Sequence, residues 1–124
     1  MIQKKHKDYL LRKYEELGKV LGALLGFKAT GNDSEIVRES DKLLSGLFDA
    51  SLADTDLGTW LISSDWPTES LTQLADILQE KADAEARLAD AQSEETQKQA
   101  QTVAQFVMKE RKTFPFHWVG REIE

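Results

Sequence analysis

Apolar residues recur at intervals of three and four positions between Tyr9 and Phe27. This spacing predicts a long amphipathic helix, because it places those residues on one face. We expect the helix to begin near Lys7 or Asp8 and to end around Ala29. Its apolar face is broad enough to indicate a central helix with other helices packed against it. The face consists of Leu10, Tyr14, Leu17, Leu21 and Leu24, and it is flanked by Leu11, Leu25, Val20 and Phe27.

A second amphipathic pattern follows within a few residues. Gly31 suits the left-handed residue that follows a helix, and Asn32 and Glu35 have the spacing of a capping box. We expect a second helix over residues 33–48. A connection this short forces the two helices to run antiparallel as a helical hairpin.

The pattern breaks down between residues 49 and 68, where apolar residues alternate irregularly with Asp, Ser, Thr and Gly. A short helix near residues 56–62 fits this stretch, and Pro67 marks the start of the next helix. We interpret the stretch as a connector that folds back over the core, because it holds two of the three tryptophans.

The last third of the chain again favours helix. A third helix is expected over residues 67–89, and a fourth over residues 93–112 with Ser93 as its cap. Because no glycine or proline separates them, one continuous helix over residues 68–112 is the alternative to a second hairpin. The chain closes with an aromatic tail that we expect to dock on the core, and its apolar residues are Phe114, Phe116, Trp118 and Val119.

The expected fold is therefore all-α, with residues 1–124 as a single helical domain. Two antiparallel hairpins are joined by a short connecting helix and closed by the aromatic tail. The composition agrees, because the chain has two prolines, no cysteine and 31% charged residues. Without cysteine, disulfides and thiolate metal sites are excluded. The longest apolar run is far shorter than a bilayer span requires, so we expect a cytoplasmic protein with no membrane partner.

Three glycines, Gly18, Gly22 and Gly26, lie four residues apart beside the apolar face of the first helix. Glycine inside a helix costs roughly 0.5–1 kcal/mol relative to alanine. The row therefore indicates a tight crossing by another helix, either within the chain or across a homodimer. On this interpretation Gly22→Leu should be strongly destabilising.

A large-large-small-large pattern occurs twice, as Tyr14-x-x-Leu17-Gly18-x-x-Leu21 and as Leu71-x-x-Leu74-Ala75-x-x-Leu78. It resembles the first helix of a tetratricopeptide repeat, in which the small residue lets the partner helix approach closely. The two copies lie 57 residues apart, whereas that family repeats every ~34 residues. The resemblance implies tetratricopeptide-like helical hairpins.

The opening Asp8-Tyr9-Leu10-Leu11-Arg12, followed by Leu-Gly pairs at 17–18 and 25–26, also resembles a family of small bacterial proteins. That family is a domain of unknown function. The resemblance covers about the first third of the chain and implies a bacterial, helical protein. It brings no activity and no site residues with it.

No catalytic, metal or cofactor motif is evident. His6 and His117 lie near opposite ends of the chain, without the Glu-x-x-His or His-x-x-x-His spacing of a metal site. We therefore predict a protein that is not an enzyme and that uses no cofactor. The leading hypothesis is an interaction module that binds a protein, a peptide or a second copy of itself through a helical groove.

Two sets of residues are candidates for binding. Packing under the connector and the tail is the simpler explanation for the tryptophans Trp60, Trp66 and Trp118, and the alternative is that they anchor a partner. The alternative function is binding of nucleic acid or another anionic surface through a basic N-terminal arm. Because the net charge of −6 repels phosphate, we do not expect nucleic acid to be the main partner. The arm consists of Lys4, Lys5, Lys7, Arg12 and Lys13.

Overall fold

A computed structural model describes residues 3–47, 57–63 and 66–110 of the chain. These residues form five helices, and no strand occurs among them. The helices are α1 (Gln3–Ala29), α2 (Asp33–Leu47), α3 (Leu57–Ser63), α4 (Thr68–Arg87) and α5 (Ser93–Glu110). The predicted all-α class is confirmed. No described helix combines the length and the apolar character needed to cross a membrane. The aromatic tail lies outside the described residues.

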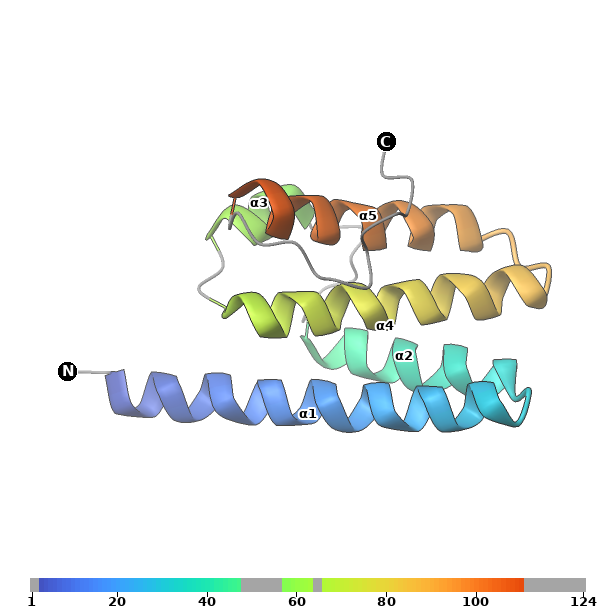
Figure 1. Cartoon of the computed structure of the whole chain (residues 1–124), viewed down its shortest axis with the longest axis horizontal. Coiled ribbons are helices and arrows are strands. Elements are labelled where there is room, and N and C mark those ends of the chain that lie inside the picture. Colours follow the sequence, from blue (N-terminus) through green and yellow to red (C-terminus); the bar gives the residue numbers. More distant parts are fainter. Residues whose placement is uncertain (1–2, 48–56, 64–65, 111–124) are drawn as a thin grey trace.

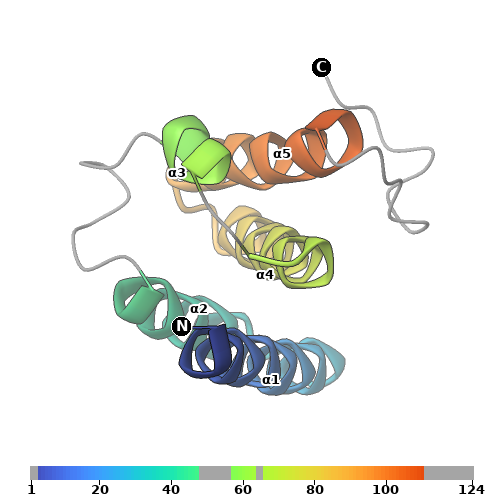
Figure 2. The same ribbon diagram turned by 90° about the vertical axis from the view of Figure 1, so that its left-hand side faces the viewer.

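The helices form three layers (Figures 1 and 2). Helices α1 and α2 lie side by side in one outer layer, α4 occupies the middle, and α3 and α5 form the opposite outer layer. The most extensive contact is between α4 and α5, and α4 also contacts both α1 and α2. The middle helix is therefore the element around which the described fold is built.

The expectation that the first helix is central is wrong. Helix α1 buries Leu17 and Leu24 completely, but Leu11, Tyr14 and Leu25 are 56%, 40% and 48% exposed. Periodicity shows how many apolar residues share a face, but it does not show whether another element covers each one. In contrast, α4 is buried along most of its length, including residues that are small or polar. Its buried residues are Ser70, Leu71, Leu74, Ala75, Ile77, Leu78, Gln79, Lys81, Ala82, Ala84 and Glu85.

Within the described chain, no other helix crosses closely over the glycine row of α1. A Cβ atom added at Gly18 would lie 3.5 Å from Nε2 of Gln73, which is an ordinary van der Waals contact. A Cβ added at Gly22 or Gly26 would have nothing within 4 Å. Both positions are exposed, so the expected overpacking by Gly22→Leu has no neighbour to act on within the described chain.

The first helix ends as its sequence predicts. Gly31 adopts a left-handed conformation with φ of 72°. The N–H of Asn32 donates to the carbonyl of Phe27 at 2.8 Å, and the N–H of Gly31 donates to that of Lys28 at 3.1 Å. These two bonds form a Schellman motif. The predicted capping box is only partly formed. It requires the N–H of Asn32 to donate to the side chain of Glu35, but this N–H donates to the carbonyl of Phe27.

The carboxylate of Glu35 instead pairs with Arg38, one turn further along α2. Nε of Arg38 lies 3.1 Å from each carboxylate oxygen, and a further hydrogen bond comes from Nη2. The hydrogen bond from Arg38 lowers the pKa of Glu35, and the same bond raises the pKa of Arg38. The carbonyl of Asn32 accepts the first hydrogen bond of α2, from Ile36, so Asn32 still occupies the cap position.

Helices α4 and α5 are separate, so the alternative of one continuous helix is wrong. Helix α4 ends in the same motif as α1, with Ala89 in the left-handed conformation at φ of 60°. The N–H of Asp90 donates to Glu85 at 2.8 Å, and the N–H of Ala89 donates to Ala86 at 3.0 Å. The carbonyl of Gln92 accepts the first hydrogen bond of α5. Ser93 is therefore the first residue of that helix and not its predicted cap.

The ends of α1 and α4 allow a test of backbone strain, because Gly31 and Ala89 adopt the same left-handed conformation. A left-handed conformation costs a residue with a Cβ roughly 1–2 kcal/mol, and glycine avoids most of this cost. We expect Ala89→Gly to raise the free energy of unfolding by about 0.5–1 kcal/mol, and Gly31→Ala to lower it by about 1 kcal/mol. Urea denaturation monitored by circular dichroism measures both changes.

The matched control is Ala86→Gly, because Ala86 is exposed and lies inside α4 three residues earlier. There, glycine should destabilise by about 0.5–1 kcal/mol. Destabilisation of similar size at positions 86 and 89 would show that Ala89 carries no strain.

Candidate functional site

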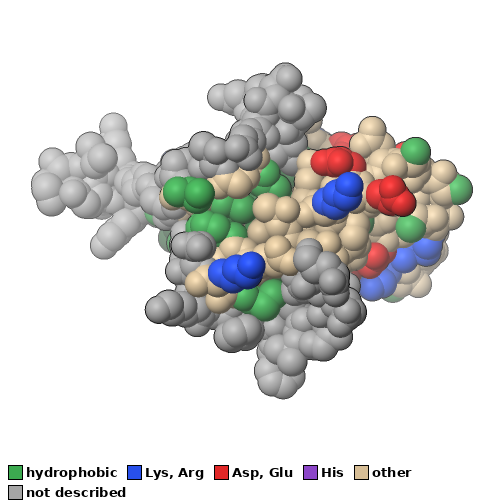
Figure 3. Space-filling model, turned by 90° about the horizontal axis from the view of Figure 1, so that it is seen from above, with side chains coloured by type: hydrophobic (Ala, Val, Ile, Leu, Met, Phe, Trp, Pro, Cys, Tyr) green, Lys and Arg blue, Asp and Glu red, His purple; other side chains and the backbone are tan. Residues whose placement is uncertain are grey.

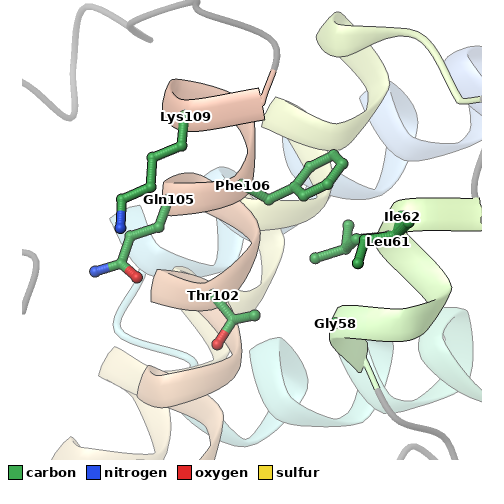
Figure 4. A pocket seen from close by; sticks show the side chains of 7 residues that line it. All are labelled: Gly58, Leu61, Ile62, Thr102, Gln105, Phe106 and Lys109. Carbon is green, nitrogen blue, oxygen red and sulfur yellow. The ribbon is translucent and has the colours of Figure 1, made fainter.

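A groove of about 370 Å³ lies between α3 and α5. Figure 4 shows that Leu61 and Phe106 extend toward one another across it, while Gln105 and Lys109 extend from α5 in the direction away from α3. The other described side chains at the groove are exposed or small. Its lining residues are Gly58, Leu61, Ile62, Thr102, Gln105, Phe106 and Lys109.

The groove follows from how α3 sits on the core. Leu61 is 1% exposed and belongs to the hydrophobic core, so it anchors the short helix. Consecutive helical residues point about 100° apart, so burial of Leu61 turns the neighbouring Ile62 outward. Ile62 is 77% exposed. Gly58 lies one turn before Ile62 and has no side chain to fill the space.

On the other side, one edge of α5 faces the groove while another faces the core. Val103 and Val107 are fully buried, whereas Thr102, Gln105 and Lys109 follow each other at helical spacing along the groove edge. The hydroxyl of Thr102 donates to the carbonyl of Lys98 at 2.8 Å. The Gln105 amide and the Lys109 ammonium therefore remain as the donor groups of the rim.

The described lining of the groove combines apolar side chains with hydroxyl, amide and ammonium groups. None of the described lining residues is a carboxylate, a histidine or a cysteine. Figure 3 shows the face formed by α3 and α5, where hydrophobic side chains gather beside a Lys or Arg side chain. An apolar floor next to a cation is complementary to an apolar side chain that has a carboxylate close to it.

The three predicted tryptophans do not form a common site among the described residues. Trp66 is 7% exposed and packs within the core, which agrees with the packing interpretation. Trp60 belongs to α3, two residues before Ile62, but the description does not extend to its side chain. Trp118 lies outside the described residues. The connector does contribute to the groove, through Leu61 and Ile62 rather than through a described tryptophan.

The predicted basic arm forms the first turns of α1. Lys4, Lys5 and Lys7 are part of this helix, and their side chains are outside the description. Arg12 is exposed. Nζ of Lys13 lies 3.3 Å from Oε1 of Glu16, so this lysine is part of an ion pair.

Sequence reasoning missed a buried polar cluster in the middle of the fold. Nζ of Lys81 lies 2.8 Å from Oε2 of Glu85, 3.3 Å from Oδ1 of Asp41 and 3.2 Å from Oγ1 of Thr96. Lys81, Glu85 and Thr96 are 8%, 2% and 2% exposed. We call these four residues the Lys81 cluster. It links α2, α4 and α5 through one ammonium group.

A second polar contact joins α4 and α5 beside the Lys81 cluster. The amides of Gln79 and Gln97 each donate to the other, at 2.7 and 2.8 Å, and Gln79 also donates to Asp83. The cluster was missed because the many polar residues over 79–85 suggest a surface that faces solvent. The available signal was the Lys81–Glu85 spacing of four residues, which places the two on one helix face.

Comparison with known proteins does not assign a family. No protein-family model, no curated protein and no solved structure matches this chain. The resemblances suggested by the sequence therefore stay predictions.

Proposed function

We propose that this chain is a non-enzymatic interaction module that binds a short peptide segment of a partner protein in the groove between α3 and α5. The observation that carries the proposal is the 77% exposure of Ile62 at the edge of an apolar groove. A large aliphatic side chain that is left in water beside an apolar floor favours a binding partner that covers it.

The size and polarity of the groove define the partner. Its volume of about 370 Å³ lies within the range of ligand pockets, ~300–1,000 Å³, and accommodates large side chains from a peptide. Burial of one such side chain contributes about 1.5–3 kcal/mol. We expect the preferred peptide to carry a Leu, Phe or Trp in the groove and an acidic residue near Lys109.

The tetratricopeptide-like arrangement is part of this proposal. Helix α1 contacts α2, and α4 contacts α5. Within each pair a short turn joins the two helices, and the first helix of each pair ends with the same pattern of hydrogen bonds. The echo of Gly18 by Ala75 has some support, since Gly18 lies beside Gln73 of α4 and Ala75 is 1% exposed. Modules of helical pairs commonly bind peptides on their surfaces.

The test is selection of peptides from a displayed random library against the intact chain, followed by affinity measurement with fluorescence polarisation. We expect Ile62→Glu to weaken the selected peptides at least tenfold, which is about 1.4 kcal/mol. Lys109→Glu should weaken acidic peptides selectively. Because Ile62 is exposed, its substitution should leave the melting temperature within a few degrees of wild type.

The matched control is Leu88→Glu, since Leu88 is 46% exposed and lies at the opposite end of α4 from α3. This variant should retain full affinity. The proposal is wrong if Ile62→Glu binds the selected peptides as tightly as Leu88→Glu does, or if selection recovers no binding peptide.

A further inference from the structure

One flank of α1, next to α4, carries a second exposed apolar surface, and α1 lies in the layer opposite the groove. Leu11, Tyr14 and Leu25 are each at least 40% exposed, and helical spacing aligns them with Gly18 and Gly22 between them. The same register continues toward the N-terminus of the helix. We call the described set the outer row of α1, and it consists of Leu11, Tyr14, Gly18, Gly22 and Leu25. Positions 4 and 7, both lysine, continue this register in the sequence, and their side chains lie outside the description.

Charge is distributed unequally between this helix and the rest of the chain. Residues 1–28 carry seven basic and three acidic side chains, net +4, whereas residues 29–124 carry nine and nineteen, net −10. Exposed Arg12 and Lys19 lie beyond the outer row on the solvent side of α1, and exposed Glu15 lies between them and the row. The first turns of α1 extend past the ends of α2 and α4 (Figure 1), so the basic end of the helix projects from the molecule.

Contrary to the expectation of no membrane partner, we propose that the outer row of α1 binds the surface of an anionic lipid bilayer, with α1 lying in the plane of the interface. A helix with exposed leucines and flanking basic residues has the composition of an interfacial helix. Tyrosine is favoured at the same depth, and clustered lysines are attracted to anionic headgroups. The net charge of −10 outside α1 would be repelled by the same surface, which orients the molecule with α1 toward the lipid.

Other occupants fit this face less well. A second copy of the chain would place one α1 with net charge +4 against another of the same charge. Nucleic acid would satisfy the basic residues, but it would leave Leu11 and Leu25 without an apolar partner. The inference goes beyond the proposed peptide binding and does not depend on it, because α1 and the groove lie in opposite layers.

The experiment is co-sedimentation of the full chain with vesicles of phosphatidylcholine alone or mixed with phosphatidylserine at about seven to three. We expect at least tenfold stronger binding to the anionic vesicles, which weakens as salt rises. The double variant Lys4→Glu/Lys7→Glu should lose this binding. Leu11→Ser/Leu25→Ser should weaken it severalfold at every salt concentration, because the apolar contribution is not screened.

Two matched controls keep the result specific. Leu88→Ser removes a leucine of similar exposure, 46%, and Lys98→Glu reverses an exposed charge on α5. Both should bind anionic vesicles like the wild type, and so should Ile62→Glu, whose defect is confined to the groove.

Three outcomes would overturn the proposal. The first is equal or absent binding to the two kinds of vesicle. The second is a dimer in light scattering, without lipid, that Leu11→Ser/Leu25→Ser converts to monomer. The third is binding to duplex DNA that is tighter than binding to anionic vesicles at the same salt and insensitive to the leucine substitutions. Circular dichroism would establish that each variant remains folded.

Discussion

Lys81→Met should lower the free energy of unfolding by about 3–5 kcal/mol, the largest loss that we expect from a single polar substitution in this chain. Methionine preserves most of the volume and helix propensity of lysine, so the loss arises from charge. It would leave the carboxylate of Glu85, 2% exposed, without the ammonium that lies 2.8 Å away. Chemical denaturation at neutral pH measures the change.

The double variant Lys81→Met/Glu85→Leu separates charge pairing from simple packing. Removing both charges should recover most of the stability, because replacing a buried ion pair by apolar groups is often neutral or stabilising. Asp41→Asn should cost less than about 1 kcal/mol, since the Asp41 side chain is 58% exposed.

The matched control is Lys98→Met, at an exposed position on α5, where the change should stay within about 0.5 kcal/mol. A loss at Lys81 as small as the one at Lys98 would mean that water reaches the Lys81 cluster. A double variant less stable than Lys81→Met alone would show that Glu85 has another favourable partner.

The first helix and its end were predictable because both had a local signal. The pattern after Tyr9 located α1, and Gly31 located its end, where φ of 72° favours glycine. The turn after α4 has the same hydrogen bonds but uses Ala89. An alanine carries no signal for a left-handed conformation, so the sequence left the hairpin and the continuous helix open.

Burial was harder to predict because it depends on the neighbours of a helix. Small and polar residues in the second half of α4 suggested little to bury. However, Ala82 and Ala84 are 3% and 0% exposed, and α5 is the element that α4 contacts most extensively. Small side chains permit close approach between helices, so a weak apolar pattern can mark the best-packed helix.

The groove could not be predicted because it joins residues that are far apart in the chain. Ile62 and Phe106 are separated by more than forty residues, and each looks ordinary within its own helix. Whether these two residues line the same groove depends on where Leu61 attaches α3 to the core. The basic N-terminal arm was visible in the sequence, but only the exposure of Leu11 and Leu25 connects it to an apolar surface.

Two adjacent leucines provide the sharpest test of which face of α1 is packed. Leu24 is 0% exposed and Leu25 is 48% exposed. We expect Leu24→Ala to lower the free energy of unfolding by about 2–5 kcal/mol, through lost burial and the cavity left behind. Leu25→Ala should change it by no more than about 0.5 kcal/mol, because alanine favours helix and little packing is lost.

Both variants should be measured by urea denaturation in dilute protein without lipid, so that no partner covers Leu25. The two variants have the same substitution in the same helix, with the same helix propensity. They differ only in the burial of the leucine that is replaced. Losses of equal size would mean that both faces of α1 are covered, which would restore α1 as the central helix and remove the exposed surface proposed to bind lipid. A large difference would establish that only one face of α1 is packed and that the outer row of α1 is available for binding.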